Sequence, residues 1–334
     1  MREFIQLIMR PLPVLILVAS LASSAALAAE GAPSIAVGGI VITHENHISI
    51  AKEVLTVSQS KVVVDYDFSN ISDADINSDL AFQMPDYESD QRPPSSQGFE
   101  DFKAWVNQKP VQYAIEVKAT ANGHDYTSLL RSMGIDIQSF GHTYDHKGAS
   151  QIEQLTQKQK DRLLKAGLLV KPNDAPNWAV RKKYSWTQTF PAHSTTHIRH
   201  EYTPALGHSN SIAYATTGDA SKIDSELASV CPTPELLNAL RKGMQQPRHA
   251  DGIDYVDFNV TTANTWVMPI VDFTLIADPA PESRSPGSSS SAGNFASFCW
   301  DGPVEKAGDN QLRAHMTDFT PIKELRVGFL QSNQ

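Results

Sequence analysis

The chain has 334 residues, of which 41% are hydrophobic, and its formal net charge at neutral pH is −9. This hydrophobic fraction is enough to build ordinary folded cores. The negative charge argues against nucleic acids and anionic membrane surfaces as partners, because both are themselves negatively charged.

The first 28 residues have the layout of a secretory signal peptide. Arg2 and Arg10 give the chain a short basic start. Residues 12–27 then carry no charge and are mostly apolar, and the run leads into the small-x-small sequence Ala26-Leu27-Ala28. The alternative is a membrane anchor, but the run is shorter than the roughly 20 apolar residues that a spanning helix needs. We therefore expect cleavage after Ala28, a periplasmic or secreted protein, and no transmembrane segment in the mature chain.

Residues 29–121 are predicted to form an antiparallel β-sandwich-like region. In the segment KVVVDYDF, residues 61–68, apolar and polar side chains alternate, which is typical of a strand with one buried face. GGIVIT, ISIAKEVLTVS and LAFQMP are further strand candidates around it. FKAWVNQKPVQYAIEVKATA is predicted to be a hairpin that turns near Asn107.

Residues 122–175 are predicted to be a helical segment. Asp125 can cap a short helix in YTSLLRSMG, and residues 150–166 have the pattern of an exposed amphipathic helix that ends at Gly167.

Residues 176–334 are predicted to be a C-terminal β-rich region, with strand candidates from SWTQTFP to ELRVGFL. One helix is expected here, with Thr233 as its N-cap and Pro234 as its first residue. The Ser-rich stretch 279–293 is predicted to be a disordered insertion between two strands. The fold class is thus mainly β (α+β): antiparallel β-sandwich-like regions with a helical segment between them and one helix in the C-terminal part.

The two cysteines, Cys231 and Cys299, are predicted to form a disulfide. An exported chain with two cysteines has one parsimonious pairing. The alternative is a reactive thiol or a metal ligand, but there is no C-x-x-C motif and no His within ligand spacing of either residue. Trp300 is expected to pack close to the bridge.

The motifs of catalysis are weak. His193, His197 and His200 have the spacing H-x3-H-x2-H, but they lie among strand signals, which place His197 and His200 on opposite faces, so no metal site is predicted. GHSNS lacks the last Gly of a nucleophile elbow, and there is no P-loop or G-x-G-x-x-G. No catalytic residue and no cofactor is predicted.

Four tryptophans allow a binding role. Trp178, Trp186, Trp266 and Trp300 lie in or near loops and strand ends, where an exposed ring can stack on a sugar or anchor a peptide. The alternative is that they fill the ends of the core, which we favour for Trp266 and Trp300. Trp178, in NDAPNWAVRKKY, is predicted to be the most exposed.

Most of the mature chain resembles a bacterial family of exported proteins that is named only as domain of unknown function 4424. The resemblance is carried by VVVDYDFSNISDADINSDLAFQMPD, NGHDYTSLLRSMGI, TFPAHSTTHIRHEYTPALG, NTWVMPIVDFTLIAD, FCWDGP and TDFTPIKELRVGFL. Ala263 stands where the family pattern has Gly, and the 279–293 insertion is longer than usual. The resemblance implies an exported bacterial protein and brings no activity, substrate or cofactor. The residues that match the pattern are His200, Tyr202, Pro204, Trp266, Pro269, Ile270, Cys299, Trp300 and Asp318.

The functional prediction is a non-catalytic binding or envelope-interaction protein whose partner is an envelope protein, a peptide or a glycan. The alternative is a hydrolase that acts on envelope or extracellular polymers, with acidic residues and His200 in its site. A cleft with two carboxylates about 5–9 Å apart, or a His with a carboxylate partner, would favour the enzyme. A flat or aromatic-lined face would favour the binding protein. The candidate ligand-binding residues are Trp178, His200, Tyr202 and Trp266.

Overall fold

The structure is a computed structural model. It describes residues 37–42, 46–84, 86–88, 101–140, 147–171, 174–209, 217–243, 252–279, 295–307 and 311–330. The predicted signal peptide, residues 1–28, and nearly all of the predicted insertion 279–293 lie outside these ranges.

The largest sheet has eight strands in the order β19-β20-β17-β3-β4-β14-β7-β8. Only the β3–β17 pair is parallel. Strands from both ends of the chain alternate in this sheet, so the regions 29–121 and 176–334 share one hydrogen-bonded ladder. The strands are β3 (Ile48–Val57), β4 (Val62–Asn70), β7 (Lys103–Val106), β8 (Lys109–Pro110), β14 (Ser194–Tyr202), β17 (Ile270–Ala277), β19 (Val304–Ala307) and β20 (Gln311–Phe319).

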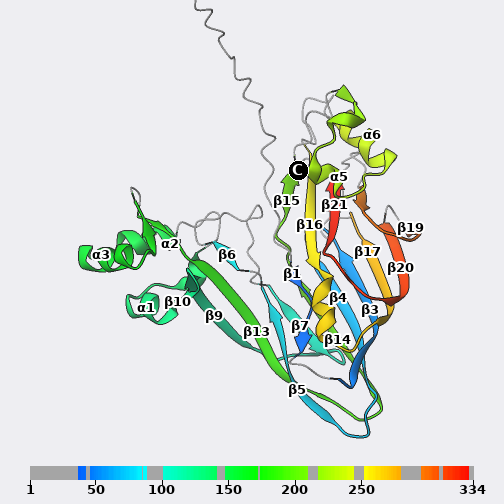
Figure 1. Cartoon of the computed structure of the whole chain (residues 1–334), viewed down its shortest axis with the longest axis horizontal. Helices are drawn as coiled ribbons and strands as arrows, with labels where there is room; N and C mark the ends of the chain where they lie inside the picture. Colours follow the sequence, from blue (N-terminus) through cyan, green and yellow to red (C-terminus); the bar gives the residue numbers. More distant parts are fainter. Residues whose placement is uncertain are drawn as a thin grey trace, which may run out of the picture.

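The second sheet has the order β10-β9-β13-β5-β2, with β6 also on β13. Short connections from β4 to β5 and from β13 to β14 carry the chain between the first two sheets at their lower end in Figure 1. The predicted turn near Asn107 is confirmed, since Asn107 and Gln108, both with positive φ, join β7 to β8. The long second arm of the predicted hairpin is wrong, because β9 leaves this sheet and pairs with β13 in the second one. The strands are β2 (Val41–Ile42), β5 (Ile76–Gln83), β6 (Tyr87–Glu88), β9 (Ala114–Ala121), β10 (His124–Asp125) and β13 (Ala179–Phe190).

A third sheet of five strands has the order β1-β16-β21-β18, with β15 also on β16. Inward side chains of all three sheets, among them Phe68, Phe82, Phe273 and Phe329, form one continuous main core. The mainly β fold class is confirmed. The strands are β1 (Val37–Gly38), β15 (Gly207–Ser209), β16 (Ile253–Asn259), β18 (Ala296–Phe298) and β21 (Leu325–Leu330); a separate pair is β11 (Leu169–Val170) with β12 (Ala175–Pro176).

The helical segment packs around its own small core at the far end of β9 and β13 (Figure 1). The N-cap of the first helix is Tyr126 rather than the predicted Asp125. Asp125 lies one residue earlier and accepts a hydrogen bond from the Thr127 N–H (2.8 Å). The prediction of one helix over 150–166 is wrong. The chain breaks there because Thr156 caps a new helix, with its hydroxyl on the Gln159 N–H and the Gln159 side chain returning to it. The helices are α1 (Thr127–Ser132), α2 (Lys147–Glu153) and α3 (Gln157–Lys165), with a 3-10 turn at Ile137–Ser139.

The C-terminal region carries α5 (Ser225–Ala228) and α6 (Pro234–Gly243), which lie beside β16 and β21 in Figure 1. The predicted helix start is confirmed, because the Thr233 hydroxyl accepts a hydrogen bond from the Leu236 N–H (3.2 Å) and Pro234 opens α6. Shorter 3-10 turns lie at Ala220–Lys222 and Val260–Thr265. No helix in the described part of the chain is long and apolar enough to cross a membrane.

The predicted disulfide is confirmed. Cys231 and Cys299 are bonded, 68 residues apart in sequence. The bridge joins the α5–α6 connection to the chain just after β18, and Ser297 adds a hydrogen bond to the Cys231 carbonyl (2.8 Å). Trp300 directly follows Cys299 in the chain. Its ring packs on the rings of Phe273 and Phe319, at the margin of the main core.

Candidate functional site

An irregularity in β3 turns a carboxyl group into the core. The β3–β4 register shifts between Ile50 and Lys52, as one extra residue in a bulge would make it. Before the shift the buried side chains are Ile48 and Ile50; after it they are Glu53 and the alternate residues that follow. Glu53 is 2% exposed, which is unusual for a carboxyl group without a cationic partner.

Three further polar side chains lie on the same inward face. Tyr66 is directly opposite Glu53 on β4, and His200 and Tyr202 follow on the neighbouring β14. The His200 ring stacks between Tyr66 and Tyr202, with centroid distances of 5.8 and 6.2 Å. We call Glu53, Tyr66, His200 and Tyr202 the core polar cluster.

Burial decides the protonation of this cluster. It raises the pKa of Glu53 to about 8 and, together with the charge of Arg199, lowers the pKa of His200 to about 3. It also raises the pKa of Tyr66 and Tyr202. The Glu53 carboxyl group and the His200 ring are therefore both neutral at pH 7. Glu53 Oε2, both ring nitrogens of His200 and the Tyr202 hydroxyl are buried and have no hydrogen-bond partner among the described residues, which reduces stability.

The cluster does not have the arrangement of a hydrolytic site. His200 is fully buried, and the rings of Phe82 and Phe102 flank it at 5.1 and 5.9 Å. A histidine with a pKa of about 3 is a weak general base at neutral pH.

Gly39 covers the Tyr66 hydroxyl. A Cβ atom at Gly39 would lie 2.3 Å from that oxygen, closer than any van der Waals contact. We expect Gly39→Ala to lower the free energy of unfolding by about 1–3 kcal/mol, as overpacking does. Urea denaturation measures it. Tyr66→Phe should recover part of the loss in the double variant, because it removes the clashing atom; strictly additive effects would contradict this contact.

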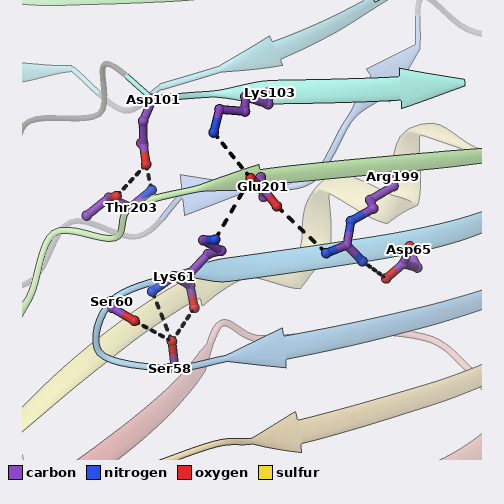
Figure 2. A network of polar contacts seen from close by, with 9 residues as sticks. All are labelled: Ser58, Ser60, Lys61, Asp65, Asp101, Lys103, Arg199, Glu201 and Thr203. Carbon is purple, nitrogen blue, oxygen red and sulfur yellow. Dashed lines mark hydrogen bonds and ion pairs between the residues drawn. The ribbon is translucent and has the colours of Figure 1, made fainter. Parts of the chain in front are cut away.

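The opposite, outer face of the same strands carries a lattice of paired charges (Figure 2). Glu201 lies near three cations, Lys103 at 3.6 Å, Arg199 at 3.7 Å and Lys61 at 3.9 Å. Arg199 also binds Asp65 at 2.9 Å. Such cross-strand pairs suit a solvated sheet face, and they leave the lattice near electrical balance.

The three predicted histidines are not brought together. His197 lies on the outer face with Asp67 at 2.9 Å from Nδ1 and Asp65 at 3.4 Å from Nε2, whereas His200 points into the core. His193 pairs with Asp73 in the turn before β14. His197 does have a carboxylate partner, Asp67, but it lies on the outer sheet face and lines neither of the two hollows described below. Within the described ranges, no three His, Cys, Asp or Glu side chains are placed to hold a metal ion.

A groove of about 430 Å³ opens where the first two sheets separate. Its floor includes Trp186, which is 8% exposed and whose indole N–H has no acceptor in the described structure. We call it the rim groove. It is lined by Val106, Asn107, Lys109, Pro110, Val111, Gln112, Trp186, Thr187 and Gln188.

The rim groove exists because β9 leaves β13 early. The last pair between these strands is Ser185 with Ala114, although β13 continues to Phe190. Val111, three residues before Ala114, still belongs with the eight-stranded sheet, because its N–H bonds the Ala104 carbonyl of β7 (2.8 Å). The chain crosses between the sheets over residues 112–113, and the space beside the end of β13 stays open.

The structure places the predicted ligand-binding residues in two cores. His200 and Tyr202 lie together in the core polar cluster, and Trp266 lies in the same main core, 4% exposed, with its indole N–H on the Ile40 carbonyl (2.8 Å). The expected exposure of Trp178 is wrong. It is 1% exposed, because the helical segment folds over it and Phe140 packs edge-on at 4.8 Å.

Trp178 nevertheless borders a second hollow of about 440 Å³ at the base of the helical segment. Asp86 and Arg181 line it too, and they form a two-pronged ion pair with distances of 2.7 and 2.6 Å. The charged groups of Asp86 and Arg181 are paired with each other, so they are less available to bind a ligand in this hollow.

Trp186 is the aromatic residue that lines the rim groove, and nothing in its sequence context distinguishes it from the other tryptophans. Alternation in 179–190 places it on the inward face of β13, as it does Tyr184. What distinguishes it is the end of a neighbouring strand, which leaves no local signal.

The fold and these surfaces define a mainly β, disulfide-bonded protein with a solvated charged face and an aromatic-floored groove at the rim of its core. The chain belongs to the family described as domain of unknown function (DUF4424), whose model matches residues 28–327. No curated protein matches it.

Two solved structures are distantly similar. One is a candidate nutrient binding protein from Legionella pneumophila, with 12% identity and a TM-score of 0.45, covering 90% of this chain and 72% of that chain. The other is an M1 zinc metallopeptidase from Deinococcus radiodurans, with 7% identity and a TM-score of 0.28, covering 85% of this chain and 43% of that chain. Neither likeness is close enough to bear on function.

Proposed function

We propose that the protein is an exported, non-catalytic binding protein that holds its ligand in the rim groove. The observation that carries this proposal is the groove itself, where the Trp186 ring lies beside three neutral amides, those of Asn107, Gln112 and Gln188. Binding sites combine apolar surface with a few placed polar groups in this way. A peptide or a glycan of the cell envelope fits that chemistry.

The polar groups of the groove are only partly used by the fold. Asn107 accepts a hydrogen bond from the His197 N–H (3.1 Å), and Gln188 donates to the Thr189 carbonyl (2.6 Å). The side chain of Gln112 makes no hydrogen bond within the described residues. It can therefore bond a ligand without giving up an internal partner.

Two further observations support the setting. A disulfide persists in oxidising compartments such as the periplasm or the medium, and Cys231 and Cys299 form one. The net charge of −9 disfavours nucleic acid as a ligand. The hydrolase alternative has less support, because His197 with its Asp67 partner lines neither hollow and His200 is enclosed by aromatic rings.

The groove is tested with one variant of its polar wall and one of its floor. We expect Gln112→Ala to weaken ligand binding about 2- to 10-fold, since it removes one hydrogen-bonding amide. Trp186→Phe should weaken it as well, because the smaller ring offers less stacking surface. Calorimetric titration of purified protein with a panel of envelope oligosaccharides and short peptides measures both.

Gln83→Ala is the matched control, because Gln83 is an exposed amide on β5, outside the rim groove. It should leave the dissociation constant unchanged, and thermal melts establish that each variant folds. A ligand that binds wild type and both groove variants equally well would place the site elsewhere.

A further inference from the structure

Given the proposed function, we infer that the ligand of the rim groove is an extended peptide that adds as an antiparallel strand to the open edge of β13, at Thr187–Phe190. Three observations support this: the register of β13 against β5, the point at which pairing with β9 stops, and the residues that line the groove.

The register shows which backbone groups of β13 face the opening. The Met84 N–H bonds the Lys182 carbonyl (2.9 Å), so the backbone of Lys182 points toward β5. Backbone groups alternate along a strand, and Trp186 and Gln188 are opposite Leu80 and Ser78 in the same ladder. The backbone N–H and C=O of Thr187 therefore point the other way, away from β5.

On that other side the neighbour has ended. Pairing with β9 stops at Ser185–Ala114, and a continued β9 would place Gln112 opposite Thr187. The crossing chain draws Gln112 away, and both residues line the rim groove instead. One edge carbonyl of this stretch, that of Thr189, is capped by the Gln188 side chain. The N–H and C=O of Thr187 are left facing the groove, and no described residue pairs with them, so they are edge groups that a peptide can use.

The opposite wall offers the peptide backbone less. The Val111 N–H bonds the Ala104 carbonyl, so at the preceding residue, Pro110, the backbone faces away from β7. Proline has no N–H to donate there and can only accept through its carbonyl. Thr187 can both donate and accept, so the added strand is expected to pair with β13.

The side chains of the groove define the peptide further. A residue opposite Gln188 points to the same side of the sheet as Trp186, where Val106, Pro110 and Val111 supply apolar surface. The residue opposite Thr187 points outward, toward solvent. The expected ligand alternates apolar and polar residues over the four positions opposite Thr187–Phe190, because Ala114 already occupies the position opposite Ser185.

Defined peptides test this. The probes are acetyl-X-Thr-X-Thr-amide, with X as Val, Leu, Phe or Tyr, titrated into the purified protein. In the best-binding peptide, N-methylation of the C-terminal Thr should weaken binding at least tenfold, because it blocks the bond to the Thr187 carbonyl. N-methylation of either X residue should change it less than about twofold, since those N–H groups point away from β13.

Two variants of one position test the same edge on the protein. Thr187→Pro removes the N–H that faces the groove and keeps the bonds to β5, so binding should fall at least tenfold. Thr187→Ala keeps that N–H, and both variants lose the Thr187 hydroxyl bond to Asp79 (2.7 Å). Alanine should therefore bind like wild type. The methylated peptides answer the question even if the proline variant does not fold.

Each outcome is decisive. Peptides that bind with no preference between the methylated positions, or oligosaccharides that bind in a Gln112-dependent way while no peptide does, would overturn the strand addition and leave the rim groove as the site. If neither class of probe binds in a way that depends on Gln112 or Trp186, the groove and the peptide are both wrong.

Discussion

Replacing Glu53 by Gln is expected to raise the free energy of unfolding by about 3 kcal/mol at pH 7, and by more at higher pH. Burial raises the pKa of Glu53 from 4.5 to about 8 in the folded protein. Between these values the folded state keeps the proton and the unfolded state releases it, so wild-type stability falls as pH rises, by about 1.4 kcal/mol per pH unit. The Gln variant has no proton to lose and escapes this fall.

His200→Phe is the mirror-image control. The pKa of His200 is lowered from 6.5 to about 3, so below pH 6.5 the unfolded state takes up a proton that the folded state refuses. Wild-type stability therefore falls as the pH drops from 6.5 toward 3, and the Phe variant lacks this fall. Urea denaturation at pH 4, 5, 7 and 8.5 separates the two. A difference between wild type and Glu53→Gln that is constant from pH 5 to 8.5 would show that Glu53 is not a buried neutral acid.

Removal of the disulfide is expected to have an effect of similar size and opposite sign, a loss of about 2–5 kcal/mol from the free energy of unfolding. Cys231 and Cys299 close a loop across a separation of 68 residues, for which the chain-entropy model gives about 4 kcal/mol. Cys231→Ser, Cys299→Ser and reduced wild type should melt at similarly lowered temperatures, because each removes the same cross-link.

The segment that carries Cys231 keeps other anchors in these variants. Val230 packs in the small core under α6, and Arg326 holds the Ser229 hydroxyl (3.1 Å) and, by two bonds, Asp257. We therefore expect a destabilised but folded protein that still binds at the distant rim groove. Two free thiols in the unreduced, denatured protein, or identical melts with and without reductant, would contradict the bridge or its structural role.

Features written in short stretches of sequence could be predicted. Alternation of apolar and polar residues in 61–68 predicts β4, because a strand with one buried face can be recognised from its own side chains. Thr233 and Pro234 specify the start of α6, because the cap and the first turn are local interactions. The count of two cysteines specified the disulfide once export was assumed.

Features that depend on a neighbour's length or register could not be predicted. Trp178 stands in a polar context, yet the helical segment covers it. Glu53 lies inside because β3 slips by one residue against β4, and a slip of one residue exchanges the faces of a strand. His200 and Tyr202 were singled out by resemblance to the family, and only the sheet shows that they face the core beside Glu53.

Periodicity, capping and composition within single segments were enough to predict long strands such as β4, the start of α6 and the pairing of the cysteines. The location of the rim groove follows instead from how the segments pack together. Trp186 and Thr187 belong to an ordinary alternating strand, and what makes them a candidate site is that β9 ends beside Ser185 while β13 continues. An edge is open only when the partner strand stops, and that is a relation between segments about 70 residues apart, Ala114 and Ser185, with no mark in either one.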